Sequence, residues 1–167
     1  MPRYIVDANV LSNRRDAEGD PNVAIWFQRY ARRVRISVVT VAEMHRGLLL
    51  LEEKAGAGTD RKLKARLAAA LRHKRAWYDL VLDRFGDRIE PMDRVVAEKW
   101  AEVSVRFPSL RDGDKAIAAT AMAKGYGIAT RNLCDFRRAG VPLVNPFDPD
   151  TWGDDFDDDP VSVLLRT

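Results

Sequence analysis

Acidic and amide side chains stand at matching places along the chain, each just after a β-favouring run or at the head of a predicted helix. These positions are Asp7, Glu43, Asp114, Asn132 and Asp135. In a parallel α/β sheet the carboxyl ends of the strands gather at one edge, so groups distant in sequence can meet in one crevice there. We therefore predict that these side chains form one site.

Such a set of side chains suits a hard divalent cation. Carboxylates in one crevice repel one another, and protons or a cation relieve that repulsion. Mg²⁺ and Mn²⁺ prefer oxygen ligands, and a site of this kind can activate water and hold a phosphodiester for in-line attack. His45, His73 and Cys134 lack metal-ligand spacing, and the sequence has neither a Gly-rich phosphate loop nor a nucleophile elbow.

Two of these acids also have a structural interpretation. Asp7 precedes a predicted helix and could be its N-cap. Glu43 stands three residues after Thr40, which is the spacing of a capping box that would open a helix from 41 to about 53. The capping and site interpretations of Glu43 differ in where its side chain points, although a site residue can also cap.

The elements that must position these residues alternate along the chain. β-Favouring runs occur at 4–6, 35–39, 88–92, 126–130 and 141–144, and helical patterns at 21–33, 41–53, 60–85, 93–105 and 115–124. This order predicts an α/β fold with a mainly parallel five-stranded sheet and helices on both faces. Pro142 places the last strand at an edge, and the small residues of 115–124 predict a buried helix that ends at Gly125.

Composition indicates one globular domain followed by an acidic tail. The 167 residues are 46% apolar and 32% charged, and the single cysteine fits a reducing cytoplasm. We find neither a signal-peptide pattern nor an apolar run of membrane-spanning length. Seven Asp residues fall within 148–159, so we divide the chain into a domain at 1–147 and an acidic tail at 148–167.

The body of the chain is basic, with its densest cluster in the predicted helix 60–85. A helix with this cluster could contact phosphates, or it could present the solvated face of an amphipathic helix, which we favour for any single residue. The basic residues are Arg61, Lys62, Lys64, Arg66, Arg72, Lys74 and Arg75.

Five motifs in order carry a resemblance to a known family. They are Tyr4–Ser12, Ser37–Met44, Asp114–Ala121, Ala129–Phe136 and Val144–Phe147. Together they resemble the PIN-domain ribonucleases, and more narrowly the VapC toxins of bacterial type II toxin–antitoxin modules, in the FitB-like branch. Each motif is weak alone, but their common order over residues 3–147 is specific.

The resemblance implies a metal-dependent endoribonuclease that cleaves RNA and slows translation. It implies that Asp7 and Asp114 are the main Mg²⁺ (or Mn²⁺) ligands, and that Glu43 binds metal or orients water. Asn132 or Asp135 would complete the site. The family also implies a homodimer and a cognate antitoxin that blocks the crevice, often with an Arg.

One departure and two alternatives bear on this expectation. The family often has Thr or Ser where this chain has Ala8, so a hydroxyl near the first acid is either missing or supplied by Ser12 or Thr40. A non-catalytic RNA-binding or regulatory protein of the same fold would be expected to have lost the acids. A phosphatase with an aspartyl nucleophile would need a second Asp where Asn9 stands.

Overall fold

A five-stranded parallel sheet forms the centre of the protein. The computed structural model describes residues 2–13, 19–57 and 60–152. The strands are β1 (Tyr4–Val6), β2 (Val34–Ser37), β3 (Ile89–Glu90), β4 (Gly127–Ala129) and β5 (Leu143–Val144). They lie in the order β3-β2-β1-β4-β5, and every adjacent pair is parallel. The predicted sheet is confirmed, with β5 at an edge.

Seven α-helices occur within these described ranges. They are α1 (Ala8–Asn13), α2 (Pro21–Tyr30), α3 (Val38–Ala57), α4 (Arg61–Phe85), α5 (Arg94–Arg106), α6 (Asp112–Lys124) and α7 (Leu133–Phe136). The side chains of Asp60 and Asp93 cap α4 and α5, and Gly125, with a φ of 66°, ends α6. None of the described helices is both long and apolar enough to cross a membrane.

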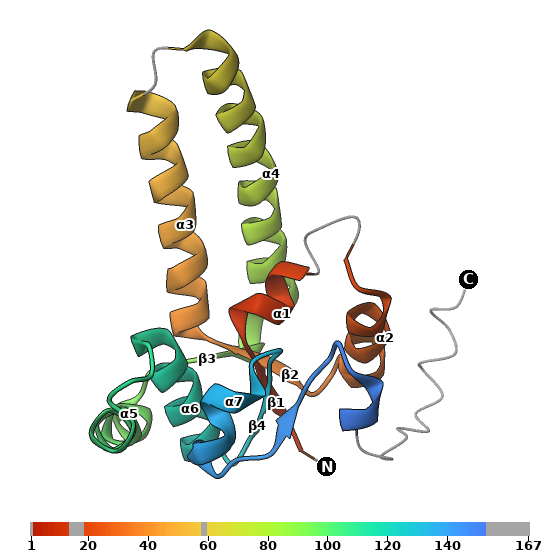
Figure 1. Ribbon diagram of the computed structural model, residues 1–167, viewed down its shortest axis with the longest axis vertical. Helices are drawn as coiled ribbons and strands as arrows, with labels where there is room; N and C mark the ends of the chain where they lie inside the picture. Colours follow the sequence, from red (N-terminus) through yellow and green to blue (C-terminus); the bar gives the residue numbers. More distant parts are fainter. Residues whose placement is uncertain (1, 14–18, 58–59, 153–167) are drawn as a thin grey trace.

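The central strand β1 contributes side chains to two core layers, because consecutive strand residues point to opposite faces of the sheet. Val6 packs with Trp26 of α2 and Val81 of α4 in one layer. Ile5 packs in the other layer, with Val96 of α5 and the small residues of α6. Helices therefore cover both faces, as predicted, and Figure 1 shows α2 on the side of the sheet away from α5 and α6.

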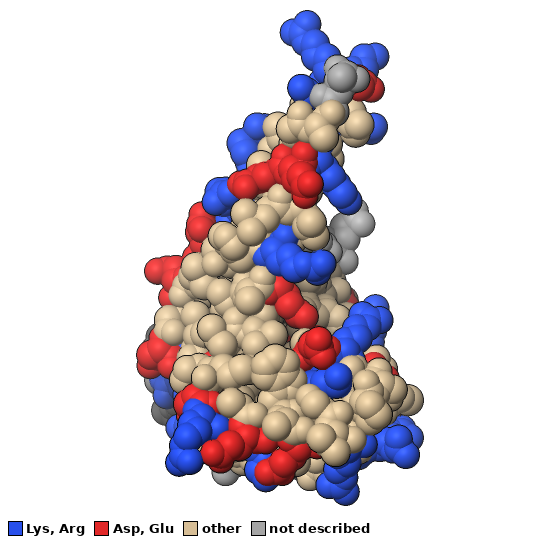
Figure 2. Space-filling view, turned by 90° about the vertical axis from the view of Figure 1, so that its left-hand side faces the viewer, with Lys and Arg blue, Asp and Glu red and all other residues tan. Residues whose placement is uncertain are grey.

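α3 and α4 pack against each other as a long hairpin that projects from the body of the molecule (Figure 1). The 20 residues of α3 span about 30 Å at the usual helical rise. Val81 and Phe85 anchor the base of α4 in the core, whereas residues 60–66 are exposed. Figure 2 shows Lys and Arg side chains gathered around the free end of the hairpin.

The structure corrects the predicted start of α3. This helix begins at Val38, and the hydroxyl of Ser37 accepts a hydrogen bond from the N–H of Val39 at 3.2 Å. Thr40 is buried inside the helix, so the predicted Thr40–Glu43 capping box is wrong. β2 ends at Ser37, its last residue paired with β3, and the β-branched residues that follow are helical.

Two smaller predictions concern α2 and the end of α3. The residue types of 21–33 predict an apolar stripe of Ile25, Trp26 and Tyr30, but Ile25 is 52% exposed, while the other two are buried. The Gly- and Ala-rich residues 55–59 predict a flexible break, but α3 continues to Ala57, and residues 58–59 lie outside the described part.

The predicted acidic tail falls mostly outside the described residues, which end at 152. Its first residues form the short helix Pro149–Thr151, and the indole N–H of Trp152 donates to the carbonyl of Asn145 at 3.0 Å. Trp152 also packs against the core layer of β1 and α2. The division of the chain at residue 147 stays a prediction.

Candidate active site

Asp7 lies at the carboxyl end of the central strand and is held there by β4. Its backbone N–H donates to the carbonyl of Ala129 at 3.0 Å. Its carboxylate oxygen Oδ2 accepts hydrogen bonds from the hydroxyl of Thr130 at 2.7 Å and from the Nδ2 of Asn9 at 2.6 Å. The pairing of β1 with β4 therefore fixes the direction of this carboxylate.

Burial dominates the ionisation of Asp7, which is only 8% exposed. Burial raises the pKa of Asp7, against the hydrogen bond from Thr130 and those from the backbone amides of Asn9 and Ala8. Because those amides open α1, Asp7 caps this helix while it also lies at the edge of the sheet. The capping contacts leave Asp7 at the sheet edge, and its role as a site residue stays a prediction.

Glu43 reaches from α3 to the first turn of α6. A Cβ placed on Gly113 would lie 2.1 Å from its Oε1, so the absence of a side chain there makes room for the carboxylate. Burial raises the pKa of Glu43, and the charges of Asp7 and Asp114 raise it further, while Arg46 and Arg111 lower it.

Asp114 shares this electrostatic environment. It lies in the first turn of α6, and its pKa is raised by burial and then by the charges of Asp7 and Asp135, with Arg111 acting in the opposite direction. Asp7 thus raises the pKa of both other acids. Asp7, Glu43 and Asp114 therefore lie near enough for their charges to act on one another, and their role in catalysis stays a prediction.

Asn132 and Asp135 form a pair beside this cluster. The backbone N–H of Asn132 donates to the hydroxyl of Thr130 at 3.0 Å, and its side-chain amide donates to Asp135. Both side chains are exposed. The charge of Asp135 raises the pKa of Asp7 and Asp114, so it reaches the cluster, whereas Asn132 connects Asp135 to Thr130.

The sequence interpretation missed the residue that supplies the hydroxyl to Asp7. Within the described ranges, Ser12 and Thr40 form no hydrogen bond with Asp7, whereas Thr130 does. Thr130 lies inside one of the family motifs and ends the predicted strand 126–130. A hydroxyl at the carboxyl end of that strand was the signal available in the sequence. Gly113 was also missed, because its contact with Glu43 arises from the packing of α3 beside α6.

The donor set fits a hard cation by its chemistry. Asp7, Glu43 and Asp114 offer only oxygen atoms, and each has its pKa raised, so each would gain from a nearby positive charge. As placed, no three His, Cys, Asp or Glu side chains of the described chain come close enough together to hold a metal ion. The fit therefore rests on the donor types and on their electrostatic coupling.

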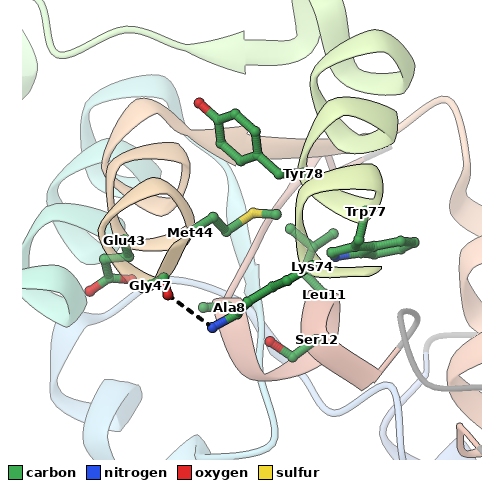
Figure 3. A pocket seen from close by; sticks show the side chains of 9 residues that line it. All are labelled: Ala8, Leu11, Ser12, Glu43, Met44, Gly47, Lys74, Trp77 and Tyr78. Atoms are coloured by element: carbon green, nitrogen blue, oxygen red, sulfur yellow. Dashed lines mark hydrogen bonds between the residues drawn. The ribbon is translucent and has the colours of Figure 1, made fainter. Parts of the chain in front are cut away.

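A pocket of about 170 Å³ opens beside the cluster, between α1, α3 and α4 (Figure 3). Glu43 lines one side, Ser12 lies on α1, and Trp77 and Lys74 come from α4. Of the three acids, Glu43 is the one among the lining residues, so the pocket extends from Glu43 toward α4.

The fold and the site define a parallel α/β protein with an acidic cluster at the carboxyl edge of its sheet. The PIN domain family matches residues 4–141. The chain therefore belongs to the PIN-domain family, as its motifs predicted.

Named relatives lie within this family. VapC ribonuclease Y4jK of Sinorhizobium fredii is 30% identical over 151 residues, which cover 87% of this chain and 98% of the relative. Toxin FitB of Neisseria gonorrhoeae is 28% identical and covers 86% of this chain and 97% of its own. The crystal structure of FitAcB from Neisseria gonorrhoeae is similar with a TM-score of 0.61 and 27% identity, over 86% of this chain and 98% of that chain.

Proposed function

We propose that this protein is a metal-dependent endoribonuclease and the toxin of a toxin–antitoxin pair, which inhibits translation by cleaving RNA. The observation that carries the proposal is the convergence of Asp7, Glu43 and Asp114, whose negative charges are coupled. Membership of the PIN-domain family and relatives named as a VapC ribonuclease and a toxin support it.

Asp7, Asp114 and Glu43 would hold Mg²⁺ or Mn²⁺. A cation bound there supplies Lewis-acid activation of the phosphodiester and of water. Thr130 and Asn9 hold the carboxylate of Asp7 in one direction, and Asp135, linked to Thr130 through Asn132, adds negative charge at the same place. Arg46 and Arg111 lie near enough to lower the pKa of Glu43, and their positive charge suits a polyanionic substrate.

The proposed partners are the RNA substrate, a cognate antitoxin and a second copy of the chain. The antitoxin and the homodimer rest on the resemblance to the VapC toxins, whose antitoxins block the acidic crevice. We expect a cytoplasmic location, which fits both the proposed RNA substrate and the single cysteine.

The test is cleavage of a structured RNA pool by the purified protein with Mg²⁺ or Mn²⁺, with a chelator in a parallel sample. Asp7→Asn is the site variant. Asp87→Asn makes the same change in charge at an exposed position on the turn that follows α4. The proposal expects cleavage that needs the metal, is lost in Asp7→Asn and is retained in Asp87→Asn.

Other results would contradict the proposal in distinct ways. Cleavage that survives Asp7→Asn would mean that the activity arises elsewhere. RNA binding without cleavage by the parent protein, under every metal condition, would favour the non-catalytic RNA-binding alternative.

A further inference from the structure

Lys74 reaches across the pocket beside the acidic cluster. It extends from α4 to α3, where its Nζ lies 3.4 Å from the carbonyl oxygen of Gly47 (Figure 3). A Cβ on Gly47 would approach that Nζ to 3.0 Å, so the glycine leaves space for the ammonium group. Gly47 lies one helical turn after Glu43, and residues at this spacing share a face of the helix.

The ammonium group of Lys74 retains donors for a ligand. An ammonium group has three N–H donors, and the contact with Gly47 is a single bond at the long end of the hydrogen-bonding range. No Asp or Glu in the described part of the chain forms an ion pair with Lys74, whereas its neighbour Arg75 pairs with Glu52. The group is half-buried and faces an open pocket, which favours an anion as its partner.

We propose that Lys74 is a positioning residue that binds a backbone phosphate of the RNA next to the phosphate that is cleaved. This rests on the proposed nuclease function. The acidic cluster would hold the cation beside the scissile phosphate. Glu43 and Lys74 line the same pocket, so the adjoining phosphate of the same strand would lie near the ammonium group. In this role Lys74 would bind the neighbouring phosphate and would not touch the reacting atoms.

Binding without cleavage gives the first test. The Asp7→Asn protein is titrated with the structured RNA pool, in the presence of a chelator and at several salt concentrations. Adding Lys74→Met keeps the aliphatic part of the side chain and removes the charge. The matched control is Lys62→Met, which makes the same change at an exposed position of α4, about 18 Å along the helix.

Loss of one charge-assisted contact predicts about tenfold weaker binding for Lys74→Met. The slope of log K against log salt should fall by about one for this variant. Lys62→Met should change binding by less than about threefold, because its charge lies far from the pocket. Lys74→Arg should restore most of the affinity, because it keeps a positive charge at position 74.

Cleavage kinetics separate positioning from a structural role. In the otherwise unaltered protein, Lys74→Met should raise KM while kcat stays within about threefold, because the contact is made before and during the reaction. A purely structural role, in which Lys74 only ties α4 to α3, predicts a lower free energy of unfolding, an unchanged salt slope and no rescue by Lys74→Arg.

The outcomes distinguish this inference from the proposed function. Cleavage that depends on Asp7, with no effect of Lys74→Met on RNA affinity or salt slope, overturns the inference alone, whatever the variant does to binding of a protein partner. An effect of Lys74 on RNA binding without any cleavage overturns the nuclease and leaves a phosphate site. No RNA binding by the parent protein overturns both.

Discussion

The carboxylate of Glu43 occupies the space in which a side chain at Gly113 would begin. The two residues come from different helices, α3 and α6, and an added Cβ at position 113 would stand 2.1 Å from Oε1 of Glu43. Gly113 precedes Asp114 in the sequence and faces Glu43 in space, so a residue without a side chain lies between two of the acids. The size of residue 113 therefore controls where Glu43 can point.

Gly113→Ala should move the carboxylate of Glu43 and lower RNA cleavage by about tenfold or more, because misplacement of a site group by an ångström is costly. Stability should change by less than ~1 kcal/mol, since the clash is with the end of a flexible side chain and alanine favours a helix. Cleavage rates and denaturant unfolding measure the two effects. Gly56→Ala is the control, because a Cβ at this helical position meets nothing within 4 Å. Full activity in Gly113→Ala would show that Glu43 is not needed where it lies.

Divalent cations should stabilise the protein in a manner that depends on pH. The pKa values of Asp7, Glu43 and Asp114 are raised, so the folded protein binds protons there more tightly than the unfolded chain. The stability that comes from these protons is complete below the unfolded pKa values and is lost as pH rises through the folded ones. A cation can replace it at neutral pH, by about 2.7 kcal/mol at a concentration 100 times its Kd.

Thermal unfolding with and without Mn²⁺ measures this linkage. The gain should be largest at neutral pH and should shrink as pH falls through the raised pKa values, because protons compete for the same oxygens. Asp7→Asn should reduce the gain and Asp87→Asn should retain it. An equal gain in both variants would place the cation elsewhere.

The hydroxyl of Thr130 should be needed for both stability and activity. It donates to Asp7 and accepts from the N–H of Asn132, and the residue is fully buried. Thr130→Val leaves both partners without that bond and should cost ~1–3 kcal/mol in denaturant unfolding. It should also raise the pKa of Asp7 and move the acidic limb of the pH–rate profile to higher pH. Thr130→Ser, which keeps the hydroxyl, should remain near the parent in both measurements.

Ser37 and Thr40 give a direct test of where α3 begins. Ser37→Ala removes the hydroxyl that caps the helix and should lower the free energy of unfolding by ~1 kcal/mol. Thr40→Val should be neutral or stabilising by up to ~1 kcal/mol, because the buried hydroxyl of Thr40 has no hydrogen-bond partner among the residues that the structure describes. Urea denaturation of the two variants checks both values, and the reverse ranking would restore the capping box.

The order of strands and helices could be predicted because each carries a local signal. Tyr4–Val6 reads as a strand from its residue types, and the acids at Asp60 and Asp93 mark helix starts through their own side chains. The start of α3 could not be predicted in this way. Val38 and Val39 favour a strand by themselves, but the strand ends where Ser37 pairs with Glu90 of β3, and this pairing is not local.

The same limit applies to the site. That Asp7, Glu43 and Asp114 would meet followed from their places at the ends of elements in a parallel sheet. The contacts that orient these acids could not be predicted from the sequence. Thr130 meets Asp7 only through the pairing of β4 with β1. Gly113 meets Glu43 only through the packing of α3 beside α6.

The place of β4 in the sheet also sets the time at which a growing chain can assemble these acids. A ribosome releases the amino-terminal strand β1 first, yet the partner that holds Asp7 comes from Ala129 and Thr130, near the other end of the sequence. Asp7, Glu43 and Asp114 can all have left the ribosome before Ala129 and Thr130 are available to bind Asp7. The order of synthesis alone therefore delays the completed acidic cluster until almost the whole domain has been made.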